Sequence, residues 1–146
     1  MAKAAHTIVL DWDGTAVPAD WPNQPTTFLP GFVGAVRTFH GAGHHMKIDS
    51  ARLNRIDPWS GQQRDPSIVE TERRYIRDVL DNMGLTYVDI WVGHGKPSGS
   101  VYIDDKGERY HGRPGSWRRL TSKVLARLGS EDPLFPVHFY EEDAVA

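Results

Sequence analysis

Cysteine and several sequence patterns are missing from this chain of 146 residues, and each absence excludes a class of protein. There is no cysteine, which excludes disulfides, thiolate metal sites and cysteine nucleophiles. No apolar run approaches the roughly 18 residues that a membrane-spanning helix needs. The apolar run nearest the N-terminus is interrupted by Asp11, so no signal peptide is predicted. From these absences we expect a soluble, cytoplasmic protein that does not enter a membrane.

The chain also lacks a strong excess of charge. Its formal net charge is −2, so no overall attraction to nucleic acid or to an anionic membrane is expected, and only a local patch could provide one. Apolar residues make up 39% and charged residues 25% of the sequence, which is ordinary for a globular protein. The length predicts a single domain over residues 1–146, with an acidic tail at 141–146.

Strand and helix patterns alternate along the chain. Strands are predicted at 6–10, 45–50, 86–92 and 101–103, with an additional edge strand at 137–140. Helices are predicted at 30–40, 66–83 and 116–128. Such alternation is typical of a sheet covered by helices on both faces. The predicted fold is therefore a single Rossmann-like, three-layer α/β/α domain with a mostly parallel sheet.

Residues 16–30 interrupt this alternation. They hold four prolines and no helical period, which predicts a loop directly after the first strand. Long irregular loops in this position often serve as functional flaps, and we refer to residues 16–30 as the flap.

Two acidic residues follow the first predicted strand. Ile8-Val9-Leu10 runs directly into Asp11 and Asp13, and Gly14 lets the backbone turn away from the strand. Alternate residues of an extended segment point to the same side, so the two carboxylates are expected to face together. Carboxylates are seldom buried unless they are paired or bind a metal. This stretch therefore predicts a divalent-cation site or a catalytic site.

Reactive side chains also stand where other strands are predicted to end. They are Ser50 after the second strand and Asp104 and Asp105 after the fourth, with Lys96 in the preceding loop. Ligands of open α/β sheets bind outside the carboxyl ends of the strands. Four carboxylates gathered there would repel one another, and Mg²⁺ is the natural cation to hold them. The lysine would bind an anionic substrate beside them.

These segments together resemble the four motifs of the haloacid dehalogenase superfamily of phosphohydrolases. Asp11-Trp12-Asp13-Gly14-Thr15 is similar to the first motif, Asp-x-Asp-Gly-Thr. The segment that ends in Ser50 resembles the second motif, and Lys96 in Gly95-Lys96-Pro97 resembles the third. Tyr102-Ile103-Asp104-Asp105 resembles the fourth. The order and spacing agree, and the motifs span residues 8–105. No stretch is long enough for a cap domain, so a capless member is expected.

The resemblance implies a role for each motif residue. Asp11 would be the nucleophile that forms an aspartyl-phosphate, and Asp13 would protonate the leaving group and then activate water. Ser50 would donate a hydrogen bond to the phosphoryl group, and Lys96 would offset its negative charge. Mg²⁺ would be held by the Asp11 carboxylate, the Asp13 main-chain carbonyl and Asp104, with Asp105 the less favoured ligand.

Three further residues are predicted substrate contacts: Thr15, Arg52 and Trp21. Arg52 is the best candidate for binding the substrate phosphate, and the alternative is that it only pairs with a nearby acid. Trp21 could contact substrate or simply pack the flap against the domain. Trp12 is expected in the core, because it points away from the acids on either side of it.

Two other groups of polar residues have a simple structural explanation. His40, His44 and His45 could be metal ligands, but no matching acid pattern accompanies them, so surface or strand-edge positions are favoured. A basic stripe on the last helix is best explained as a solvated face, although together with Arg113 it could also steer a phosphorylated polymer. The stripe consists of Arg119, Lys123 and Arg127.

The sequence thus predicts a magnesium-dependent phosphatase that hydrolyses a phosphate monoester on Asp11. The substrate is expected to be a small phosphorylated molecule. One alternative is a polynucleotide 3′-phosphatase acting on nucleic-acid ends, and another is a non-catalytic phosphate-binding or regulatory domain. A second copy of the chain could close the open site as a homo-oligomer.

Overall fold

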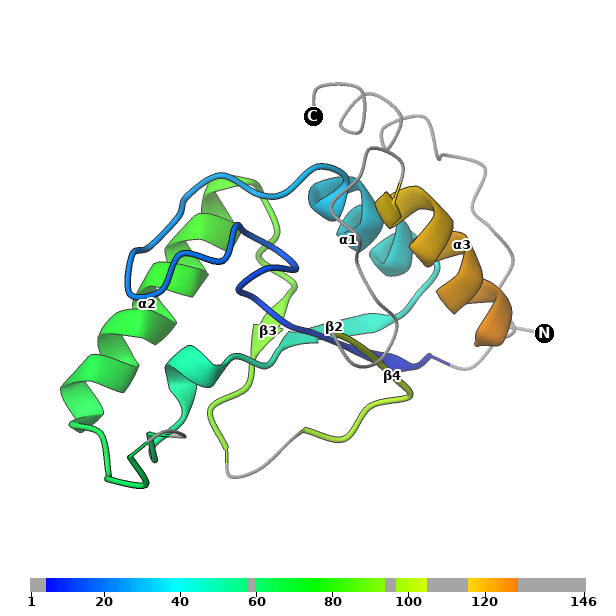
Figure 1. The fold of residues 1–146 in the computed structure, drawn as a ribbon. Helices are drawn as coiled ribbons and strands as arrows, with labels where there is room; N and C mark the ends of the chain where they lie inside the picture. The colour runs from blue at the N-terminus through cyan, green and yellow to red at the C-terminus, as the bar shows by residue number, and fades with distance from the viewer. Residues whose placement is uncertain (1–4, 58–59, 94–96, 105–115, 129–146) are drawn as a thin grey trace.

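The computed structural model describes residues 5–57, 60–93, 97–104 and 116–128, and it has an α/β fold. A four-stranded, all-parallel sheet has the order β3-β2-β1-β4 (Figure 1). The strands are β1 (Thr7–Leu10), β2 (His45–Ile48), β3 (Asp89–Ile90) and β4 (Val101–Ile103). The helices are α1 (Phe32–Gly41), α2 (Pro66–Asn82) and α3 (Ser116–Arg127), and the short 3-10 turn η1 (Ala51–Leu53) follows β2. These elements confirm the predicted alternation of strands and helices.

The register of the strands places six apolar residues of the sheet on one face. Ile8 of β1 pairs with Met46 and with Val101, and two positions along, Leu10 pairs with Ile48 and with Ile103. Residues that are paired, or two apart, point to the same side of a sheet. All six side chains are buried in one core cluster.

All three helices contribute to that same cluster, through residues such as Phe32 of α1, Ile76 of α2 and Trp117 of α3. Figure 1 shows the helices on one side of the sheet, and the described residues of the segment between β3 and β4 on the other side. In the part of the chain that is described, the fold therefore differs from the expected three-layer α/β/α arrangement.

The handedness of parallel connections explains this difference. Right-handed connections place α1 and α2 on the same face, because β1, β2 and β3 follow one another in one direction across the sheet. The connection from β3 to β4 runs in the opposite direction and so crosses the opposite face. Its described residues form no helix. The second face is consequently left with partly exposed polar side chains, including Lys47.

Local sequence signals set the helix ends. The Asp65 side chain accepts a hydrogen bond from the backbone of Ser67 at 2.9 Å, and Pro66 occupies the first turn of α2, as predicted. The α1 helix begins at Phe32 and not at the expected Pro30, because Gly31 takes a left-handed conformation (φ 84°) at its N-cap.

Some expectations fall outside the described residues. These are the edge strand at 137–140 and the acidic tail at 141–146. Within the described residues, no helix combines the length and the apolar character needed to cross a membrane.

The histidines near the amino ends of the strands contact protein groups. His44 is buried, and its Nδ1 accepts a hydrogen bond from the backbone of His6 at 3.2 Å. The ring of His40 stacks on Tyr87, and His45 is exposed. The described residues contain no group of three or more histidine or acidic side chains placed to hold a metal. Burial, and then the neighbouring His6 and His45, lower the pKa of His44.

The lowered pKa of His44 predicts a loss of stability in acid. The unfolded chain binds a proton at His44 more readily than the folded chain does, so the contribution is present above about pH 6.5 and is lost as the pH falls through the folded value. We expect the free energy of unfolding to fall less between pH 7.5 and pH 5.5 in His44→Asn than in the parent protein. Asn keeps an acceptor near the position of Nδ1 but does not titrate. Urea unfolding at the two pH values measures the difference, and equal losses in both proteins would contradict the assignment.

Candidate functional site

The ends of β1 and β4 bring two acids together. The backbone N–H of Asp11 donates to the carbonyl of Ile103 at 3.0 Å, which continues the pairing of Leu10 with Ile103 by one residue. Asp11 and Asp104 therefore follow adjacent strand ends side by side. Both residues are partly exposed, and the Asp11 carboxylate accepts a hydrogen bond from the backbone of Trp12 at 2.8 Å.

A tight turn then takes the chain away from β1. The carbonyl of Trp12 accepts hydrogen bonds from the backbone N–H groups of Thr15, Ala16 and Val17 at 2.8–3.2 Å. Gly14 adopts φ 76°, a conformation that side chains strongly disfavour. This turn holds Asp13 beyond the strand end and buries Thr15.

Ser50 stands at the end of the neighbouring strand. The backbone of Asp49 donates to the carbonyl of Leu10 at 2.9 Å, so the end of β2 lies against the end of β1. Ser50 is buried, and its hydroxyl oxygen accepts from the backbone of Arg52 at 3.1 Å, which caps η1. A hydroxyl that accepts one bond still has its own proton to donate.

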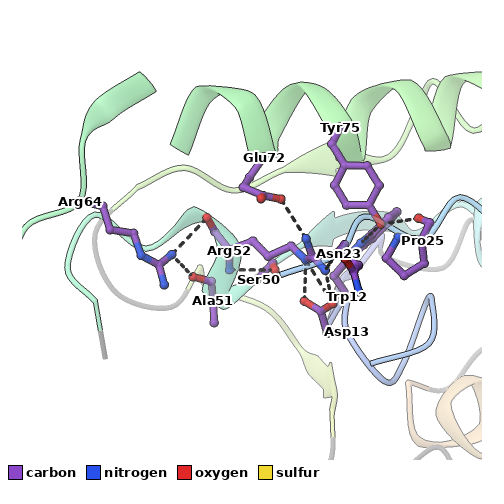
Figure 2. A network of polar contacts seen from close by, with 10 residues as sticks. All are labelled: Trp12, Asp13, Asn23, Pro25, Ser50, Ala51, Arg52, Arg64, Glu72 and Tyr75. Carbon is purple, nitrogen blue, oxygen red and sulfur yellow. Dashed lines mark hydrogen bonds and ion pairs between the residues drawn. The ribbon is translucent and has the colours of Figure 1, made fainter. Parts of the chain in front are cut away.

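Among the described residues of this region, Arg52 makes the most side-chain hydrogen bonds (Figure 2). Its Nε and Nη2 donate to both carboxylate oxygens of Asp13 at 2.8–3.1 Å. On its other side, Nη1 donates to the carboxylate of Glu72 at 3.0 Å, and Nη2 also donates to the carbonyl of Asn23 at 2.5 Å. The Arg52 side chain is only 1% exposed.

Aromatic rings enclose the same guanidinium. Its central carbon lies 4.9 Å from the ring centroid of Trp21 and 5.2 Å from that of Tyr75. The Tyr75 hydroxyl accepts from the indole nitrogen of Trp12 at 3.2 Å and donates to the carbonyl of Pro25. Arg52 and Tyr75 thus attach the flap, through Asn23 and Pro25, to helix α2 (Figure 2).

The electrostatics favour a charged cluster. Burial alone would lower the pKa of Arg52, but hydrogen bonds and charge from Asp13 and Glu72 outweigh it and raise the pKa. One buried cation is thereby shared by two carboxylates. Asp13 is the more accessible of the two, with 24% of its side chain exposed against 9% for Glu72. Its carboxylate therefore borders both solvent and the buried arginine.

The structure brings together Asp11, Asp13, Ser50 and Asp104, four of the residues that the sequence predicted at this site. Of the two readings of Arg52, the pairing with a nearby acid is the one observed. Trp21 is 44% exposed and lies over Arg52, so it both packs the flap and presents a ring to solvent. Trp12 is fully buried, as expected.

Several predicted residues lie outside the described part of the chain. They are Lys96, Asp105, Arg113 and the side chain of Arg127. Arg119 and Lys123 of the basic stripe are exposed on α3.

Glu72 and Tyr75 were not predicted as site residues from the sequence, although the spacing of residues in α2 indicated that both are buried. They share a helix face with Ile76 and Val79, at the spacing of three and four residues that defines the buried side of α2. A glutamate on an apolar helix face needs a cationic partner. The pattern alone does not reveal that this partner is Arg52.

The residues at the strand ends fit Mg²⁺. Asp11 and Asp104 offer two carboxylates at adjacent strand ends, and the main-chain carbonyl of Asp13 would be the third oxygen ligand. Mg²⁺ prefers hard oxygen ligands, and it commonly uses one or two carboxylates with waters and substrate phosphate. The Asp13 carboxylate already accepts hydrogen bonds from Arg52. The main-chain carbonyl of Asp13 is therefore more suitable as a metal ligand than its carboxylate.

Comparison with known proteins identifies no relative. No family model matches the chain, and neither a curated protein nor a solved structure does.

The buried arginine gives a testable prediction for stability. Arg52→Met leaves the Glu72 carboxylate buried without its cation, and we expect it to lower the free energy of unfolding by about 3–5 kcal/mol. The double variant Arg52→Met/Glu72→Leu removes both charges, so its cost should be well below the sum of the two single costs.

Glu70→Gln is the matched control, because the Glu70–Arg73 ion pair of the same helix is exposed. Its cost should stay below about 1 kcal/mol. Urea unfolding measures all four variants. Strictly additive costs for Arg52 and Glu72 would contradict their coupling.

Proposed function

We propose that the protein is a magnesium-dependent phosphatase of the haloacid dehalogenase type, without a cap domain, and that it hydrolyses a phosphate monoester on Asp11. The observation that carries the proposal is the convergence of Asp11, Asp13, Ser50 and Asp104 where β1, β2 and β4 end. Their order along the chain and their chemistry agree with the motifs that the sequence resembles.

In the first step, a carboxylate oxygen of Asp11 attacks phosphorus. The new oxygen–phosphorus bond forms as the bond to the leaving group breaks, and the leaving oxygen takes a proton from Asp13. The hydroxyl of Ser50 donates to a phosphoryl oxygen and orients the group. Bound Mg²⁺ supplies positive charge that offsets the charge on phosphate and nucleophile.

In the second step, water attacks the phosphorus of the aspartyl-phosphate. Asp13 takes a proton from that water as inorganic phosphate leaves and the Asp11 carboxylate is regenerated. Leaving groups that depart without a proton, such as p-nitrophenolate, depend less on Asp13 in the first step.

The proposal predicts magnesium-dependent hydrolysis of p-nitrophenyl phosphate. Asp11→Asn should lower kcat by about 10³-fold or more, because an amide is a poor nucleophile and covalent catalysis is lost. Asp20→Asn is the matched control, since Asp20 is an exposed acid of the flap, and its activity should equal that of the parent protein.

Two results would contradict the proposal. Activity that survives Asp11→Asn would exclude Asp11 as the nucleophile. A folded protein that hydrolyses no ester in a broad panel of phosphate monoesters would favour a non-catalytic phosphate-binding domain.

A further inference from the structure

A second feature on the same edge of the sheet is a cleft of about 590 Å³. It lies between the segment that follows η1, the first half of α2 and Val92, which follows β3. These segments all come after the carboxyl ends of β2 and β3. The cleft therefore opens on the edge of the sheet that carries Asp11 and Asp13.

The cleft is strongly cationic. Arg55, Arg64 and Arg73 line it, and Glu70 is the one acid among its lining residues. Glu70 pairs with Arg73, with nitrogen–oxygen distances of 2.6 and 2.8 Å. In the part of the chain that the structure describes, Arg55 and Arg64 form no ion pair with a carboxylate. Two guanidinium charges thus remain to attract an anion.

Arg64 is held in place before any ligand arrives. Its Nη1 donates to the carbonyl of Ala51 at 2.8 Å and to that of Arg52 at 3.3 Å. A guanidinium has five N–H donors in a fixed fork, so the Nε and Nη2 donors remain for a ligand. A positioned fork of this kind suits phosphate oxygens and loses little freedom on binding.

The rest of the lining is apolar. It includes Ile56, Val69 and Val92, and Ile56 is 55% and Val92 41% exposed. Exposed aliphatic side chains beside cationic ones form a surface that suits a molecule with both a flat apolar part and a negative charge.

Trp21 connects the cleft to the candidate site. Its ring centroid lies 4.9 Å from the guanidinium carbon of Arg52, which binds Asp13, and 5.4 Å from that of Arg64, which lines the cleft. A leaving group that extends from the phosphate on Asp11 past Trp21 would reach the cleft. The exposed indole offers it a stacking surface on the way.

We propose that the cleft binds the leaving-group side of the substrate, and that this leaving group is a nucleoside carrying a second phosphate. The apolar lining and Trp21 would hold the base and sugar. The second phosphate, with a charge between −1.5 and −2 for a monoester, would be balanced by Arg55 and Arg64. This inference rests on the proposed phosphatase function and names its substrate class.

The test compares two probes that differ in one group: adenosine 3′,5′-bisphosphate and adenosine 3′-phosphate. Release of the 3′-phosphate is measured for both. We expect kcat/KM to be at least about tenfold higher for the bisphosphate, since charge-assisted bonds from two arginines contribute at least that factor. Arg55→Gln and Arg64→Gln should each reduce this preference several-fold.

Arg74→Gln is the matched control. Arg74 follows Arg73 on α2, but its side chain is 73% exposed and does not line the cleft. The preference for the bisphosphate should survive this change. If Arg74→Gln abolishes the preference as fully as Arg55→Gln does, the effect is general electrostatic attraction and the cleft proposal is wrong.

Equilibrium binding separates the two proposals. Calorimetry with the Asp11→Asn variant measures the affinity for adenosine 3′,5′-bisphosphate without turnover, with and without Arg55→Gln. Loss of affinity on Arg55→Gln supports the cleft, even if the parent protein proves unable to hydrolyse any ester. Hydrolysis of p-nitrophenyl phosphate that depends on Asp11, without any preference between the two adenosine probes, would overturn the cleft and leave the phosphatase standing.

Discussion

The interaction on which the region depends is the burial of one guanidinium between two carboxylates. Arg52 joins three segments, each at least 20 residues away from it in sequence. They are the turn after β1 through Asp13, the flap through Asn23, and helix α2 through Glu72. A buried cation is stable only while its hydrogen bonds are made, so each partner fixes the others. The position of Asp13 is therefore set by helix α2 as much as by the strand that precedes it.

The two acids that follow the first strand are held by different parts of the fold. Asp11 belongs to the sheet, because its backbone bonds to β4. Asp13 belongs to the arginine cluster, and its carboxylate is bonded to Arg52. On the proposed mechanism, the nucleophilic carboxylate and the proton-transferring carboxylate therefore depend on different contacts. On the proposed mechanism, a change in α2 would alter proton transfer while leaving the nucleophile in place.

Local patterns in the sequence were sufficient to predict the alternation of strands and helices and the strand that precedes Asp11. Asp65-Pro66 marks the start of α2, and the apolar run before Asp11 marks the central strand, because capping and strand burial depend on neighbouring residues. The placement of the helices on one face was not predictable in that way. For α1 and α2 it follows from the order of β1, β2 and β3 across the sheet, a long-range arrangement that no local pattern records. The same limit applies to Glu72, whose partner lies 20 residues away.

If Asp11 is the nucleophile, it becomes covalently phosphorylated during turnover, and mass spectrometry detects the added phosphate. The Asp13→Asn variant is incubated with Mg²⁺ and p-nitrophenyl phosphate and quenched in acid, because loss of the base that activates water should make the intermediate accumulate. We expect one added phosphoryl group on the peptide that contains Asp11, and none when Asp11→Asn is added to the variant. Release of p-nitrophenol with phosphate on no residue, or on a residue other than Asp11, would contradict it.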